Sequence, residues 1–166
     1  ELIGYGDLGA IAEPLALSYL VPVASDLGCD VKILDLRLHP ESLDSVLNEF
    51  QPNILGVTGY SMHVPRMLEI CARARELCPP VLTIVGGHHA TLLPEDFKSP
   101  QVDLIVVGEG TAPFRKILKR HQGRLLTSIP GVWERLGDSY RYGGDQSEIQ
   151  LDSLPEPDRT LTGDDR

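Results

Sequence analysis

Short apolar runs alternate with helical repeats along most of the chain. Runs rich in Val, Ile and Leu predict buried strands at residues 31–36, 54–58, 81–85 and 102–107, and Leu2-Ile3 is interpreted as the remnant of a first strand. Between them, apolar residues recur at i, i+3, i+4 and i+7, which predicts helices that bury Leu43, Met67 and Phe114. Strands and helices are therefore expected to alternate.

Two helix ends carry further signals. A first helix is predicted from Glu13-Pro14 towards Leu27, and Pro22 lies inside it. Proline has no N–H for the bond to the carbonyl four residues earlier, so a kink is expected there. Thr111 is predicted to cap the last helix, with Pro113 in the first turn, where a missing N–H costs little.

The alternation defines the expected fold class. Strand, helix and strand repeat at roughly 25-residue spacing, the size of one crossover unit. Right-handed crossovers then give an α/β fold, a doubly wound five-stranded parallel sheet that is flavodoxin- or Rossmann-like, with strand order 2-1-3-4-5. The expected cofactor-binding domain covers residues 1–128.

The pattern changes after His121. Residues 131–136 and 139–142 alternate in polarity around Gly137-Asp138, which predicts a β-hairpin within an extension at residues 129–145. Residues 146–166 contain Pro155, Pro157 and many acids, and are expected to form a linker.

Composition narrows the class of partner. The 166 residues are 42% hydrophobic but only 5% aromatic, so the core is expected to be aliphatic, and the length suits one domain. A formal net charge of −9 disfavours nucleic acid and anionic membrane surfaces, although an acidic surface also serves solubility. The longest apolar run, residues 14–24, is about half the ~20 residues that a spanning helix needs.

The three cysteines, Cys29, Cys71 and Cys78, are odd in number and lack zinc-site spacing. Cys71 and Cys78 fall on one side of a predicted helix and are expected to pack as small apolar residues. The N-terminus shows no basic region or cleavage site of a signal peptide, so a reducing cytoplasm is the expected compartment.

Ligands of open parallel sheets bind beyond the carboxyl ends of the strands. The loops expected there, residues 5–9, 58–63, 86–91 and 108–111, are rich in Gly and small polar residues. Glycine lets the backbone approach a bulky ligand, whereas the Gly86-Gly87 pair also fits a tight turn that needs positive φ. Glu109 is either a ligand-facing acid or a partner for N–H groups of the adjoining helix.

Other chemistries have weaker patterns. Gly4-x-Gly6-x-x-Gly9 has dinucleotide-binding spacing, and Asp35 could hold a ribose, but no full strand precedes the glycines. His63, His88 and His89 do not have metal-ligand spacing. No nucleophile elbow or acid–base carboxylate pair is present.

Five motifs in order resemble the N-terminal cobalamin-binding domain of cobalamin-dependent radical S-adenosylmethionine enzymes. They are Val-Gly-Gly-His-His-Ala-Thr from Val85, Val-Asp-Leu-Ile-Val-Val-Gly-Glu-Gly from Val102, Glu-Pro-Leu-Ala-Leu-Ser-Tyr-Leu from Glu13, Ile-Pro-Gly-Val from Ile129, and Leu-Asp-Ser-Leu-Pro-Glu-Pro-Asp-Arg from Leu151. The resemblance implies that a C-terminal radical S-adenosylmethionine domain of the same polypeptide follows, with a 4Fe-4S cluster and S-adenosylmethionine, commonly as a methyltransferase.

The chain also departs from the family pattern. Asp7 is followed by Leu8-Gly9-Ala10, without the His that ligates cobalt in other cobalamin proteins, so the resemblance implies base-off cobalamin with no histidine lower ligand. Thr111 replaces a Glu after Gly-Glu-Gly. The cysteine triplet for an iron–sulfur cluster is absent, so catalysis of that kind is not expected of this chain alone.

The resemblance implies a set of cofactor-binding residues and no metal ligand. Thr58 and Tyr60 correspond to the loop beside the lower face of the corrin, and Gly86 and Gly87 to the pair that makes room for the nucleotide tail. The set is Thr58, Gly59, Tyr60, Ser61, Met62, Gly86, Gly87, His88, Gly108, Glu109 and Gly110. Coordination of cobalt by Met62 or His63 stays open and is not favoured.

Two rival functions remain. One is a domain that has kept this fold but lost cobalamin, and that positions or regulates its partner domain. The other is a nucleotide-binding or receiver-like α/β domain. A receiver would require a phosphorylatable Asp after the third strand, where Thr58 stands.

Overall fold

A computed structural model describes residues 13–123, 128–147 and 154–162. The predicted strand at Leu2-Ile3, the Gly4-x-Gly6-x-x-Gly9 pattern and the Asp7 loop lie outside the described residues, as does the start of the last motif at residues 151–153.

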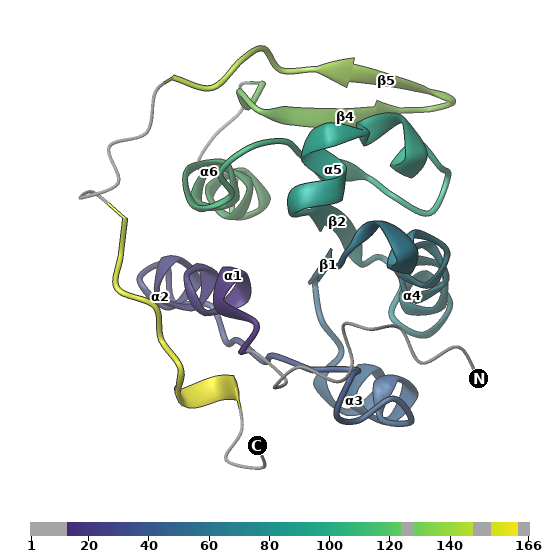
Figure 1. Cartoon of the computed structure of the whole chain (residues 1–166), viewed down its shortest axis with the longest axis vertical. Helices are drawn as coiled ribbons and strands as arrows, with labels where there is room; N and C mark the ends of the chain where they lie inside the picture. The colour runs from purple at the N-terminus through teal and green to yellow at the C-terminus, as the bar shows by residue number, and fades with distance from the viewer. Residues whose placement is uncertain (1–12, 124–127, 148–153, 163–166) are drawn as a thin grey trace.

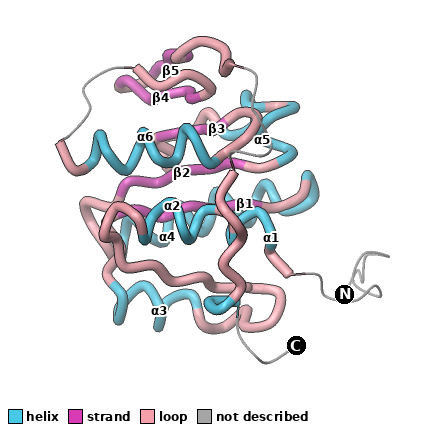
Figure 2. Tube along the Cα trace, turned by 90° about the vertical axis from the view of Figure 1, so that its left-hand side faces the viewer, coloured by secondary structure: helices cyan, strands magenta, loops and turns pink. Residues whose placement is uncertain are grey.

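The described strands form one sheet in the order β1-β2-β3-β4-β5 (Figures 1 and 2). They are β1 Ile54–Thr58, β2 Leu82–Gly86, β3 Leu104–Val106, β4 Val132–Leu136 and β5 Ser139–Tyr142. β1, β2 and β3 are parallel, whereas β4 and β5 are antiparallel to their neighbours. The fold is thus α/β and Rossmann-like, but the sheet is mixed, because the predicted hairpin pairs with β3 and extends it.

The prediction of a strand at residues 31–36 is wrong. No strand is assigned there, although Leu34 and Leu36 pack against the core that contains Leu43 and Leu47. In the order 2-1-3-4-5 this segment would pair with residues 2–3, which lie outside the described residues, so that order is not confirmed. The apolar residues of this segment pack against the core, but no described strand pairs with it.

Helices cover both faces of the sheet (Figures 1 and 2). They are α1 Leu15–Ser18, α2 Leu20–Ser25, α3 Leu43–Phe50, α4 Val64–Leu77, α5 His88–Leu92 and α6 Thr111–His121, with 3-10 turns η1 Ser61–His63, η2 Pro94–Phe97 and η4 Thr160–Thr162. α2 and α6 lie together on one side of the sheet, and α4 and α5 on the other. Within the described ranges, no helix is long and apolar enough to span a bilayer.

The core is aliphatic on both faces, as the composition predicts. On one face Met67 and Cys71 of α4 pack with Val85 and Ile105; on the other Ile117 of α6 packs with strand residues. Cys71 is fully buried and Cys78 nearly so, which confirms their expected role as small apolar residues.

The predicted kink in the first helix is confirmed as a break between α1 and α2 at Tyr19. Pro22 has no N–H to donate to the Ser18 carbonyl four residues earlier. The helix therefore opens one turn before the proline.

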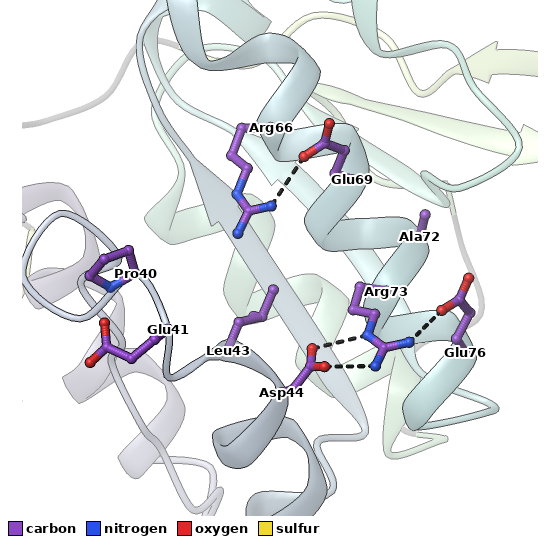
Figure 3. Close-up of a pocket in the computed structure, with 9 residues that line it drawn as sticks. All are labelled: Pro40, Glu41, Leu43, Asp44, Arg66, Glu69, Ala72, Arg73 and Glu76. Atoms are coloured by element: carbon purple, nitrogen blue, oxygen red, sulfur yellow. Dashed lines mark hydrogen bonds and ion pairs between the residues drawn. The ribbon is translucent and has the colours of Figure 1, made fainter. Parts of the chain in front are cut away.

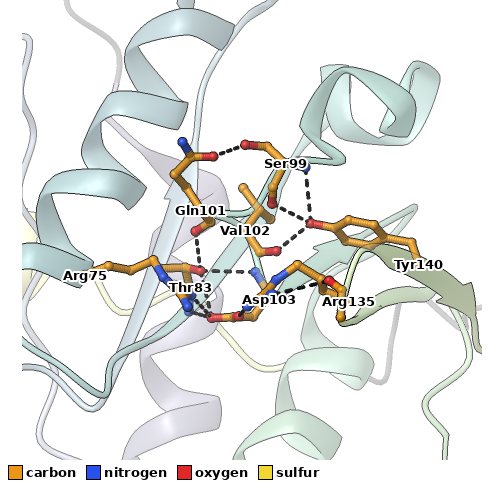
Figure 4. Close-up of polar contacts among 9 residues, drawn as sticks. Arg75, Thr83, Ser99, Gln101, Val102, Asp103, Arg135 and Tyr140 are labelled. Atoms are coloured by element: carbon orange, nitrogen blue, oxygen red, sulfur yellow. Dashed lines mark hydrogen bonds and ion pairs between the residues drawn. The ribbon is translucent and has the colours of Figure 1, made fainter.

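The hairpin is anchored by Asp103, which immediately precedes β3 (Figure 4). Its carboxylate accepts hydrogen bonds from Arg135 of β4 at 2.7 Å, Arg75 of α4 at 2.8 Å, and the backbone N–H and hydroxyl of Thr83 at 3.0 and 2.9 Å. The Tyr140 hydroxyl reaches the Ser99 carbonyl at 2.9 Å. One carboxylate thus connects α4, β2 and β4.

Candidate functional site

Three of the loops predicted to bind a ligand meet at one edge of the sheet. Thr58 and Gly86 are register partners at the carboxyl ends of β1 and β2, and β3 runs parallel beside them. The carboxyl ends of parallel strands share an edge, so the loops that begin at Thr58, Gly86 and Val107 lie side by side there. The fourth predicted loop, residues 5–9, is outside the described residues.

The two glycines after β2 have different surroundings. Gly87 has φ +98°, and a Cβ on it would lie 2.3 Å from the Thr58 Oγ1, so no other residue fits without a shift. A Cβ on Gly86 would meet Val106 at 3.6 Å, an ordinary contact. Gly87 therefore allows the approach of Thr58, while Gly86 has room for a side chain that the sequence does not place there.

Thr91 joins the second and third loops. Its hydroxyl donates to the Gly87 carbonyl and accepts from the Gly108 N–H, both at 2.9 Å. The Gln146 side chain adds a bond to the Glu109 carbonyl at 3.1 Å. Neither Thr91 nor Gln146 was singled out from the sequence, because both roles depend on residues distant along the chain.

The Glu109 carboxylate is hydrogen-bonded to the first residues of α6. Its carboxylate accepts from the Thr111 N–H at 2.8 Å, the Thr111 hydroxyl at 2.7 Å and the Ala112 N–H at 3.5 Å. The acid thus satisfies the N-terminus of α6, where negative charge is stabilised. Thr111 is the first residue of α6 rather than its cap, which is Gly110. The three described loops, which begin at Thr58, Gly86 and Val107, consequently present no free carboxylate.

The loop after β1 exposes apolar side chains. Tyr60 is 66% exposed and Met62 69% exposed, and Leu92 and Leu93 at the end of α5 are 63% and 52% exposed. His63 is half-buried, and its Nδ1 accepts from the Tyr60 N–H at 3.2 Å. One ring nitrogen of His63 is therefore engaged in holding its own loop.

His89 has partners that the sequence did not predict. His89 is only 7% exposed. Its Nδ1 lies 2.9 Å from the Ser61 Oγ and its Nε2 lies 2.9 Å from an Asp96 carboxylate oxygen. His88 is exposed. The motif read as Gly-Gly-His-His is thus a turn followed by α5, whose two histidines have opposite environments.

A pocket of about 450 Å³ lies elsewhere, between α3 and α4 (Figure 3). It is lined by Pro40, Glu41, Leu43, Asp44, Arg66, Glu69, Ala72, Arg73 and Glu76, none of which belongs to the predicted set. Arg73 pairs with Asp44 and Glu76, and Arg66 with Glu69. The Arg73–Asp44 pair joins α4 to α3, whereas the other two pairs lie within α4.

Two alternative chemistries gain little from the geometry. The Asp35 carboxylate, considered for a ribose, forms an ion pair with Arg37 at 2.6 Å. Among the residues that the structure describes, no three His, Cys, Asp or Glu side chains converge as for a metal ion.

Comparisons with known proteins agree on one family. The sequence profile of the B12 binding domain matches residues 3–118. An uncharacterized methyltransferase of Pyrococcus horikoshii is 27% identical over 93% of this chain and 35% of its own length. The cobalamin-dependent radical SAM methyltransferase TokK of Streptomyces tokunonensis is 32% identical over 52% of this chain and 13% of its own.

A solved structure has the same fold. The radical S-adenosylmethionine methyltransferase TsrM of Kitasatospora setae, with cobalamin and a [4Fe-4S] cluster bound, superposes with a TM-score of 0.65 at 21% identity, covering 87% of this chain and 28% of that one. The chain spans about a third or less of the length of these relatives. With the profile match over most of its length, the chain belongs to the B12 binding domain family.

Proposed function

We propose that this chain binds cobalamin at the carboxyl-terminal edge of its sheet, in the base-off form and without a histidine ligand to cobalt. The proposed contacts are the residues that the family resemblance implies at the ends of β1, β2 and β3: residues 58–62, 86–88 and 108–110. The observation that carries the proposal is an edge without a free carboxylate in these loops, since Glu109, the one acid among these residues, accepts hydrogen bonds from the N-terminus of α6.

The residues present suit a corrinoid. A corrin is broad, largely apolar and fringed with amides, so it calls for apolar contact and backbone polar groups more than for charge. Exposed Tyr60 and Met62 supply apolar surface, and Gly86 leaves room where a Cβ would meet Val106 only at 3.6 Å. These features support the proposal that the ring lies at the loop after β1 and the nucleotide tail lies beside Gly86.

The proposed lack of a histidine ligand rests on the described histidines. His89 is buried and bonded at both ring nitrogens, and His63 uses Nδ1 within its own loop. Both ring nitrogens of His89 and the Nδ1 of His63 already have partners, so these three atoms are poor candidates for cobalt. The segment that would carry the usual ligand, around Asp7, has no histidine in its sequence.

Cobalamin supplies a cobalt centre that carries a methyl group between donor and acceptor. We propose that the parent protein is a methyltransferase whose radical S-adenosylmethionine domain, with its 4Fe-4S cluster, is in the same polypeptide. In this view residues 1–128 bind the cofactor, residues 129–145 form the hairpin extension and residues 146–166 lead to that domain. A reducing cytoplasm remains the expected compartment, and nucleic acid and membranes are not expected partners.

Hydroxocobalamin tests the proposal directly. The purified chain is mixed with the cofactor, desalted and examined by visible spectroscopy; a retained, shifted cobalamin spectrum is expected. A chain that emerges colourless would contradict it and favour a domain that has kept the fold and lost the cofactor.

The coordination is tested by reducing the complex to cobalt(II) and recording its electron paramagnetic resonance spectrum. Splitting of the cobalt lines by a nitrogen nucleus would contradict a base-off form without a histidine ligand. Loss of such splitting in His63→Ala would assign the nitrogen to His63. Neither effect is expected.

A further inference from the structure

The geometry points to His89 as a positioning residue that makes the Ser61 hydroxyl a hydrogen-bond acceptor for an N–H donor of the bound corrinoid. This inference rests on the proposed function. It concerns residues brought together from three segments: η1, α5 and η2.

The first step is the fixed tautomer of His89. An ionised carboxylate only accepts hydrogen bonds, so its 2.9 Å contact with Nε2 requires the proton on that nitrogen. In a neutral imidazole the other nitrogen, Nδ1, is then an acceptor. Asp96 thereby selects one tautomer.

The second step is the polarity of Ser61. Its Oγ lies 2.9 Å from Nδ1, so the hydroxyl proton is donated to the ring. The lone pairs of Oγ remain for a partner outside the pair. Ser61 is itself exposed, between exposed Tyr60 and Met62, whereas His89 is buried and contacts Phe97 edge-on. The ring is thus held firmly, and the hydroxyl it orients lies on the loop proposed to contact the corrin.

The third step is the ligand chemistry. The rim of a corrin carries primary amides, whose N–H groups are donors. A serine hydroxyl that was free to rotate would serve a donor or an acceptor equally. A hydroxyl committed to His89 favours a donor, so the relay from Asp96 to Ser61 sets the polarity of this contact.

The tautomer is measured without ligand. A long-range 1H–15N correlation spectrum of the chain is expected to show His89 protonated on Nε2. Asp96→Asn, which offers either an acceptor or a donor, is expected to give a mixture of tautomers. Protonation of the wild-type ring on Nδ1 alone would overturn the inference.

Binding is then measured by titration with hydroxocobalamin. Ser61→Ala is expected to weaken binding by about fivefold to tenfold, as for loss of one neutral hydrogen bond, and Ser61→Thr to restore it. Asp96→Asn is expected to fall between these two. Glu95→Gln and Ser139→Ala, matched changes at exposed sites outside the proposed contacts, are expected to bind as the wild type does.

Two failures are distinguishable. A wild-type chain that takes up no hydroxocobalamin overturns the proposed function together with this inference. A chain that binds, with Ser61→Ala equal to the wild type or with Ser61→Thr as weak as Ser61→Ala, overturns the role of Ser61 alone. Asp96 is 49% exposed in its side chain and Ser61 is exposed, so these variants are expected to fold.

Discussion

The backbone N–H of Asp158 donates to the carbonyl oxygen of Ser18 at 2.9 Å. Pro22, four residues after Ser18, has no N–H for that carbonyl, and a residue far along the chain supplies one instead. Arg159 and Glu13 form an ion pair beside it at 3.3 Å. The Leu-Pro-Glu-Pro-Asp-Arg motif is thus joined to the broken first helix, which begins with another of the family-like motifs.

Ser18→Ala is expected to stabilise the chain. The Ser18 side chain is fully buried, and its Oγ has no hydrogen-bond partner among the described residues. Removing a buried unpaired hydroxyl relieves a desolvation cost, so the free energy of unfolding should rise by about 1 kcal/mol. Urea denaturation measures the change. Ser25→Ala, at an exposed helix end, is the control and should stay within about 0.5 kcal/mol; a loss of stability in Ser18→Ala would reveal an unseen partner.

Gly87→Ala and Gly86→Ala should separate stability from binding. A Cβ at Gly87 meets the Thr58 Oγ1 at 2.3 Å and sits at φ +98°, so a loss of about 2–4 kcal/mol in the free energy of unfolding is expected. Gly86→Ala makes only an ordinary contact and should change stability by less than about 1 kcal/mol. Thermal unfolding measures both variants.

Cofactor binding by Gly86→Ala tests the proposed position of the nucleotide tail. Gly86→Ala is expected to weaken hydroxocobalamin binding by about tenfold or more, because the new methyl group occupies space proposed for the nucleotide tail. Titration of the folded variant measures it. Unchanged affinity would place the tail elsewhere.

Asp103→Ala should loosen the hairpin. The change leaves Arg75, Arg135 and the Thr83 N–H without their acceptor, and a loss of about 2–4 kcal/mol is expected. Hydrogen exchange at β4 and β5 should rise along with the fall in the unfolding free energy. Tyr142→Phe, in the same hairpin but outside this cluster, serves as the matched control. Equal exchange in Asp103→Ala and the wild type would show that strand pairing alone holds the hairpin.

The same carboxylate predicts a pH dependence. Burial raises the pKa of Asp103, but hydrogen bonds from Thr83, Arg135 and Arg75 lower it by more, so the net pKa lies below its ordinary value of 3.8. A folded pKa below the unfolded one adds stability above the unfolded pKa, and this stability is lost as the pH falls through the folded pKa. Unfolding measured from neutral pH downwards should therefore show a loss beginning near pH 4. The Asp103→Asn variant should lack this component.

Alkylation should distinguish the cysteines. Burial raises the pKa of the Cys71 thiol to about 12, with a smaller contribution from Asp103, and burial also raises the pKa of Cys78. Only thiolates react readily, so iodoacetamide at about pH 8 is expected to modify half-buried Cys29 and to spare the other two. Mass spectrometry reads the result, and the chain unfolded in guanidinium should be modified at all three. Labelling of Cys71 in the folded chain would show local opening of α4.

The sequence determined the local elements. The repeats through Leu43, Met67 and Phe114 predicted α3, α4 and α6. The three apolar runs from residue 54 predicted β1, β2 and β3, and Pro22 predicted the break between α1 and α2. The hairpin around Gly137 was equally visible. Backbone periodicity and proline chemistry are local, so residues close in sequence suffice to indicate them.

Tertiary structure alone decided the partners. Ile105 faces Trp133 across an antiparallel pair that makes the sheet mixed, and the segment at residues 31–36 packs on the core without a described ladder. The Ser61–His89–Asp96 contacts join residues 28 and 7 positions apart. No periodic pattern encodes such pairings, because they follow from how the helices and strands pack in space and from which polar groups that packing leaves to be satisfied.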